Sequence, residues 1–196
     1  MSESVTFISH PLTKDKWQDF ENLFGAKGAC GGCWCMFFLL PGKEFYAGKG
    51  EQLHQLMQKK VCDNQEMPGL IAYHDGEPAG WIALGPREQY LRLENSRILK
   101  PVDEQSVWSI VCFFVGKKYR KMGMNLFLIK SAVQYAKDKG IKVLEAYPVE
   151  PKGDKVPDVF AYTGFLSTFQ KAGFNEVARR SPTRPIMRYF INETNS

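Results

Sequence analysis

Residues Val107 to Asn125 read VWSIVCFFVGKKYRKMGMN, an apolar run joined to a basic loop. The run 107–115 is continuously apolar instead of alternating, which predicts a strand buried on both faces. Beyond the loop, residues 124–139 predict an amphipathic helix that Gly140 closes. Its apolar positions recur at helical spacing: Leu126, Phe127, Ile129, Ala132, Val133 and Ala136.

The loop between strand and helix predicts an anion site. A tight turn into a helix leaves backbone N–H groups unpaired and directs the positive end of the helix dipole at one point, where a pyrophosphate binds well. Four of the first six loop residues are basic: Lys117, Lys118, Arg120 and Lys121. A basic helix amino terminus without a ligand is the competing interpretation.

Strands and helices are predicted on both sides of the segment 107–125. Asp75-Gly76 marks a tight turn between two antiparallel strands, and the charged connection 86–105 contains Pro86 and Pro101 and predicts one short helix. We expect a single domain over 1–196, without repeats or linkers. The other predicted strands are 5–8, 70–73, 79–84, 143–147, 175–178 and 186–190; the other predicted helices are 12–24, 53–61 and 160–171; residues 28–50 are expected to be irregular.

Two motifs in this order are specific. Arg120-x-x-Gly123-x-Asn125 opens the helix after the buried strand, and Phe169-Gln-Lys-Ala-Gly-Phe174 lies near the carboxyl end. The combination resembles the GNAT superfamily of acyl-CoA-dependent N-acyltransferases. The resemblance implies an α/β (α+β) fold: a mixed, mostly antiparallel sheet of about seven strands, flanked by helices and splayed between the fourth and fifth strands.

The resemblance also implies the ligands. Acetyl-CoA would be the co-substrate, and the acceptor an unidentified amine of a small molecule or peptide, attacked directly. The pantetheine arm would follow the backbone of Phe113, Phe114 and Val115, and the pyrophosphate would lie against Arg120, Lys121, Met122, Gly123, Met124 and Asn125. Asn125 departs from the Gly or Ala that the family prefers. The alternative function is a non-catalytic module that binds CoA or a metal.

Phe169 occupies the position where many members of the resembled family carry a Tyr that protonates the departing thiolate. A phenyl ring cannot donate a proton, so the acid must lie elsewhere. Tyr147 is the first candidate because it shares a strand face with Glu145, the candidate base. Tyr162 is the second, seven residues before Phe169 on the expected helix. Each of the three has a purely structural interpretation as well.

Cys30, Cys33 and Cys35 follow a Cys-x2-Cys-x-Cys pattern within Gly31-Gly32 and Trp34. Zinc sites need four ligands, and only a distant Cys62 or His54 would complete the set, so we expect no metal. The segment would then form a wall of the acceptor site or pack as small buried thiols. The run Arg179 to Arg184 would favour an acidic acceptor, although an exposed turn is the commoner meaning.

The whole-chain properties exclude several function classes. The formal net charge of +5 over 196 residues suits an anionic small ligand, and the absence of a long basic tract argues against nucleic acid. No apolar run reaches the length of a membrane span, and the amino terminus lacks the features of a signal peptide. We therefore expect a cytoplasmic protein with reduced thiols, and leave a homodimer open.

Overall fold

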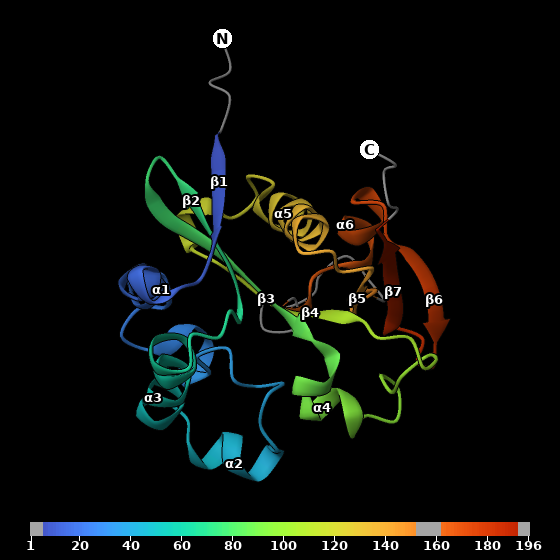
Figure 1. Cartoon of the computed structure of the whole chain (residues 1–196), viewed down its shortest axis with the longest axis horizontal. Helices are drawn as coiled ribbons and strands as arrows, with labels where there is room; N and C mark the ends of the chain where they lie inside the picture. The colour runs from blue at the N-terminus through green and yellow to red at the C-terminus, as the bar shows by residue number, and fades with distance from the viewer. Residues whose placement is uncertain (1–5, 152–161, 192–196) are drawn as a thin grey trace.

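The computed structural model describes residues 6–151 and 162–191, which build one seven-stranded sheet in the order β1-β2-β3-β4-β5-β7-β6 (Figure 1). All neighbours pair antiparallel except β4 and β5, which are parallel. This architecture confirms the predicted fold class. The strands are β1 (Phe7–Pro11), β2 (Gly69–His74), β3 (Glu77–Pro86), β4 (Trp108–Val115), β5 (Val143–Ala146), β6 (Asn175–Arg179) and β7 (Pro185–Phe190).

Helices cover both faces of the sheet. Figure 1 shows α5 and α6 on one face and α1, α2 and α3 on the other. Two hydrophobic clusters match this division, one centred on Trp81 and Phe20 and the other on Ile82 and Leu128. The helices are α1 (Trp17–Phe24), α2 (Gly42–Ala47), α3 (Glu51–Gln58), α4 (Leu91–Glu94), α5 (Met124–Asp138) and α6 (Leu166–Lys171).

The β2–β3 hairpin turns where the sequence predicts it. Asp75 and Gly76 have φ angles of 50° and 81°, the left-handed pair that a two-residue hairpin turn requires. Asp tolerates this region better than most residues, and Gly adopts it freely.

The sheet opens between β4 and β5. Trp108 to Ile110 pair with Leu144 to Ala146, and the pairing ends there. On the other side of β4, Ala83 pairs with Cys112 and Leu84 with Ile110, so Val111 is the extra residue of a β-bulge. A bulge bends its strand and increases the local twist. The splay predicted between the fourth and fifth strands is therefore present, and it begins at the bulge.

Several predicted boundaries differ. The helix predicted over 12–24 begins as a 3-10 turn over Lys14–Lys16 and is α-helical only from Trp17. β1 begins at Phe7, and Val5 lies outside the described residues. The segment 28–50 is not wholly irregular, because it contains α2. The helix predicted over 53–61 gives way after Gln58 to a π-helical turn. The helix predicted over 160–171 was wrong in its first part: within the described residues α6 begins only at Leu166, because Gly164 adopts a left-handed φ of 77°.

Within the described ranges 6–151 and 162–191, no helix has both the length and the apolar composition required to cross a membrane.

Candidate active site

A cavity of about 450 Å³ lies at the amino terminus of α5, between the end of β4 and α6. We call it the α5 cavity. It collects the predicted anion loop, the splayed part of β4 and the start of α6 around one space. Its walls are Phe113, Val115, Tyr119, Arg120, Lys121, Gly123, Met124, Asn125, Leu126, Tyr162, Phe165, Thr168 and Lys171.

The backbone at the start of α5 is shaped to receive an anion. Gly123 precedes the helix with φ 84°, and the N–H of Phe127 is the one that bonds back to the Gly123 carbonyl. The N–H groups of Met124, Asn125 and Leu126 thus have no partner within the helix. A Cβ built on Gly123 would meet nothing within 4 Å, so a ligand can approach this backbone closely.

The charge of the α5 cavity matches a pyrophosphate. Three cations line it, Arg120, Lys121 and Lys171, and its described lining contains no carboxylate. The side-chain Oδ1 of Asn125 is buried and has no hydrogen-bond partner among the described residues. Because the amide O and N of Asn are interchangeable by a flip, this group can offer a donor to a bound phosphate. Asn125 is therefore compatible with a phosphate-binding loop.

Most of the predicted cofactor residues line this cavity, but Phe114 and Met122 do not. The Phe114 ring packs on the opposite face of the sheet against Phe24, with 5.2 Å between centroids. Met122 is 36% exposed. Only the backbone of Phe114 is in a position to contribute, because the side chains of a strand alternate between faces.

A second cavity, of about 610 Å³, lies beside α4, and we call it the α4 cavity. It is bounded by the segment after the cysteines, the connection from α4 to β4, and the β6–β7 turn. Tyr162 belongs to the walls of both cavities. The α4 cavity is lined by Phe37, Phe38, Pro41, Gly42, Leu91, Arg92, Asn95, Ser96, Ile98, Leu99, Tyr162 and Arg184.

Tyr162 is fixed by aromatic contacts. Its ring lies 5.8 Å from that of Phe37 and 6.3 Å from that of Phe38, centroid to centroid. Burial raises the pKa of its hydroxyl, while the nearby Arg184 and Arg92 act in the opposite direction. The expected helical relation to Phe169 was wrong, because Tyr162 precedes the break at Gly164 and lies outside α6. Its chain neighbours, not a helix face, direct it to the cavities.

Tyr147 and Glu145 are placed differently. Both are fully buried, and neither lines the α5 or the α4 cavity. The Tyr147 hydroxyl donates to Glu145 Oε1 at 2.6 Å, and Arg87 Nη1 donates to that hydroxyl at 2.5 Å. Arg188 Nε donates to the other carboxylate oxygen at 2.7 Å. Burial, reinforced by the Glu145 charge, holds the pKa of Tyr147 well above its usual value.

This buried network joins distant segments. Ser109 on β4 contacts the Tyr147 hydroxyl at 2.7 Å, and Arg87 Nη2 donates to the Leu99 carbonyl at 2.9 Å. Arg188 also holds Asp103 through two bonds of 2.7 and 2.9 Å. The network therefore links β4, β5 and β7 by hydrogen bonds to the connection between α4 and β4, which forms one wall of the α4 cavity. The sequence indicated the shared face of Tyr147 and Glu145 but not their arginine partners.

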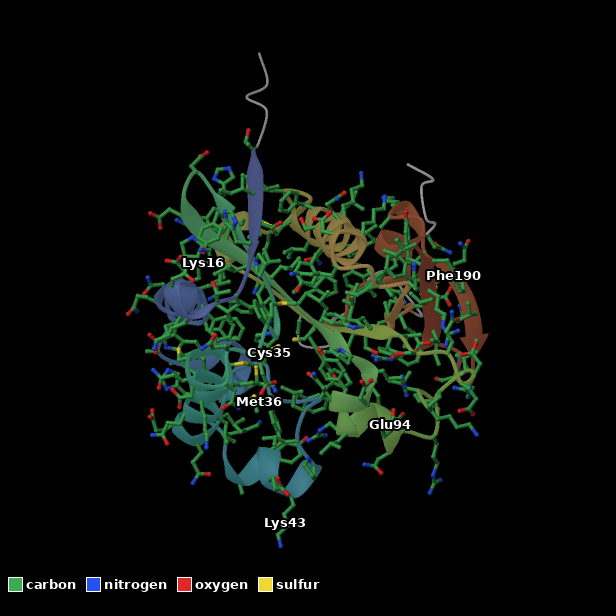
Figure 2. All side chains as sticks on the ribbon, in the orientation of Figure 1. Lys16, Cys35, Met36, Lys43, Glu94 and Phe190 are labelled. Atoms are coloured by element: carbon green, nitrogen blue, oxygen red, sulfur yellow. The ribbon has the colours of Figure 1, made fainter. Side chains whose placement is uncertain are left out.

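The cysteine segment has two parts with different surroundings. Cys35 is buried, and the Trp81 indole N–H donates to its sulfur at 3.1 Å. Figure 2 shows Cys35 and Met36 in the interior near β3, whereas Lys43 on α2 points outward. Phe37 and Phe38, which follow, line the α4 cavity. Both proposed roles, packing and acceptor-site wall, thus have a structural counterpart in adjacent residues.

No group of three His, Cys, Asp or Glu side chains in the described part of the chain is arranged to hold a metal ion. His54, one of the conceivable fourth ligands, has its Nε2 within 2.6 Å of Glu21 Oε1. Cys30 is exposed, Cys33 is half-buried, and burial raises the pKa of the Cys33 thiol. A raised pKa favours the protonated thiol, which is a poor metal ligand.

The comparisons with known proteins bear on this geometry. The sequence profile of the acetyltransferase (GNAT) family matches residues 34–165, which include β4, the anion loop and α5. The chain belongs to this family. The sequence-based prediction of an acetyl-CoA-dependent N-acetyltransferase is thereby confirmed, with its acceptor unidentified. No curated protein matches the chain in sequence.

Solved structures of GNAT acetyltransferases share the fold at low identity. The PaiA N-acetyltransferase of Thermoplasma acidophilum, crystallised with coenzyme A, is 14% identical, with a TM-score of 0.53 over 95% of this chain and 99% of that one. A Listeria monocytogenes GNAT acetyltransferase is 6% identical, with a TM-score of 0.59 over 97% and 98%. Ard1 of Thermoplasma volcanium is 12% identical, with a TM-score of 0.52 over 96% and 100%. At such identities the likeness establishes the fold alone.

Proposed function

We propose that this GNAT acetyltransferase binds acetyl-CoA in the α5 cavity and an amine in the α4 cavity, and that the acetyl group crosses between them beside Tyr162. The observation that carries this proposal is that Tyr162 lines both cavities. The neutral amine attacks the thioester carbonyl carbon directly, the C–S bond breaks, and the thiolate receives a proton. The amine nitrogen loses one proton to solvent.

The α5 cavity suits acetyl-CoA in three respects. The unpaired N–H groups at the start of α5 would hold the pyrophosphate, and Arg120, Lys121 and Lys171 would balance its charge. Beyond the bulge, no described strand pairs with the backbone of β4 on the β5 side, so the pantetheine amides can pair with it as an added strand. The T. acidophilum relative was crystallised with coenzyme A, which is consistent with this assignment.

We assign the proton donor to Tyr162. Its raised pKa keeps the hydroxyl protonated at neutral pH, so it can donate to the departing thiolate. Tyr147 and Glu145 remain candidates from the sequence, but their burial and their arginine partners support a positioning role. No carboxylate belongs to the described walls of either cavity, which favours water as the immediate proton acceptor.

The test is an amine panel incubated with acetyl-CoA. Release of free CoA thiol is followed over time, and acetylated amine is identified by mass spectrometry. The proposal predicts thiol release that depends on one class of amine. Tight binding of acetyl-CoA without acetylation of any amine would contradict it and favour a regulatory CoA-binding module.

A further inference from the structure

Two arginines in the α4 cavity have no acidic partner among the described residues. Arg92 reaches it from α4 and Arg184 from the β6–β7 turn, and both lower the pKa of Tyr162 against the larger effect of burial. In the described parts of the chain neither guanidinium lies within 4.0 Å of a carboxylate. The described wall of the α4 cavity contains no Asp or Glu. Within the described structure, no carboxylate therefore neutralises these two cations beside the proposed transfer point.

The Arg92 guanidinium is held in place, but one of its nitrogen atoms has no hydrogen-bond partner among the described residues. Its Nε donates to the Leu40 carbonyl at 3.1 Å, and its guanidinium lies over the Phe37 ring, 3.9 Å from the centroid. Its Nη2 is buried and has no hydrogen-bond partner in the described structure. An unpartnered buried donor on a charged group costs free energy unless a ligand fills its place. A rigid guanidinium with an open donor is a ready-made anion receptor.

Arg184 is also half-buried at this site. Its Nη1 lies 3.3 Å from Thr163 Oγ1, and burial lowers its pKa. Neighbouring arginines of the same turn differ: Arg179 pairs with Glu176 and Glu150, and Arg180 donates to three backbone carbonyls. The sequence run therefore divides into structural arginines and one that faces the cavity.

Resting on the proposed function, we infer that the acceptor is a small amino-carboxylate with an apolar or aromatic body, a compound of the amino-acid class. Its carboxylate would pair with the guanidinium groups of Arg92 and Arg184, since their planar forks match carboxylate geometry. Its body would pack on the apolar wall formed by Phe37, Phe38, Pro41, Leu91, Ile98 and Leu99. An amine close to that carboxylate would then lie near Tyr162.

The experiment compares amino acids with their amides, which keep the side chain and the amine but lose the negative charge. Apolar and aromatic amino acids, their amides and the corresponding decarboxylated amines are assayed by CoA thiol release. For at least one amino acid, kcat/KM should exceed that of its amide by about 10- to 100-fold, the range of a charged hydrogen bond. The amide amine is the less basic of the two, so its larger neutral fraction works against this result.

Variants assign the effect to the two arginines. Arg184→Gln and Arg92→Gln should raise KM for the amino acid by a larger factor than KM for the decarboxylated amine, which has no carboxylate for them to bind. Arg97→Gln, an exposed arginine on the same connection and outside the cavity wall, is the matched control and should match the parent. Thermal unfolding of each variant identifies a loss caused by misfolding, and Arg184→Gln serves if Arg92→Gln unfolds.

The inference is overturned if amides or simple amines are acetylated as well as the amino acids, or if the substitutions reduce both activities equally. Acetylation of phosphorylated amines in preference to carboxylates would also overturn it. Failure of the proposed function is distinct, because no amine of any class is then acetylated, whether or not acetyl-CoA binds in isothermal titration. In that event, binding of an N-acetyl amino acid to the parent but not to Arg184→Gln would still support the anion site, and equal or absent binding would reject it.

Discussion

The α5 cavity and the α4 cavity meet at Tyr162 but are built by different means. The α5 cavity is made largely of backbone: a helix amino terminus, a left-handed Gly123 and a strand edge freed by the bulge at Val111. The α4 cavity is made largely of side chains from four separate segments, 37–42, 91–99, Tyr162 and Arg184. A backbone site accepts a ligand common to a whole family, whereas a side-chain site is free to differ in each member.

The largest expected effect is in the buried network, where a substitution tests whether Glu145 positions other residues or takes part in the reaction. In Glu145→Gln, Arg87 and Arg188 lose their common carboxylate, and the free energy of unfolding should fall by about 3–5 kcal/mol. Urea unfolding measures this, with the exposed Glu104→Gln as control. If the folded Glu145→Gln enzyme keeps a kcat within a few-fold of the parent, the positioning role stands. A fall of about 10²-fold would restore Glu145 as the base.

Tyr162→Phe should distinguish the role of Tyr162, where the two cavities meet, from that of the buried network around Tyr147. It removes the proposed acid and should lower kcat by about 10²-fold with acetyl-CoA affinity retained. Because burial raises the pKa of Tyr162, the parent should lose no activity through its deprotonation at neutral or mildly alkaline pH. Tyr147→Phe should instead lower the stability of the fold. Tyr46→Phe, at an exposed position, should change neither kcat nor stability. Equal rates for the parent and Tyr162→Phe would leave substrate positioning as the source of catalysis.

Gly123→Val probes the backbone site. The positive φ of Gly123 is costly for a β-branched residue, and the new side chain would enter open space where the pyrophosphate is proposed to lie. We expect acetyl-CoA affinity to fall by about tenfold or more, because the new side chain blocks the approach of the pyrophosphate to the backbone. Gly140→Val at the other end of α5 has the same strain, with φ 67° and open space. Equal affinities in the two variants would refute the assignment.

The smallest effect is expected at the cysteine segment. Chelation should leave the melting temperature and activity unchanged, since no metal-ligand cluster exists among the described residues. Stoichiometric zinc that survives purification and chelation would contradict this prediction.

The two cavities also differ in how far the sequence predicts them. Most of the wall of the α5 cavity comes from one contiguous segment, so the run from Val107 to Asn125 was sufficient to predict its anion-binding part, although not the contribution of α6. The α4 cavity joins Phe37, Arg92 and Arg184, which lie on three segments and meet only through the fold. Arg184 had a weak signal in its basic run, and Arg92 had none. The helix expected over 160–171 failed because one glycine with positive φ outweighed the apolar spacing.

The most direct test is a crystal structure of the chain with acetyl-CoA bound. We expect the pyrophosphate within hydrogen-bond distance of the backbone N–H groups of residues 123–126. The pantetheine should lie along residues 113–115 of β4, with the thioester beside Tyr162. A pyrophosphate bound elsewhere, or a thioester directed away from Tyr162 and the α4 cavity, would contradict it.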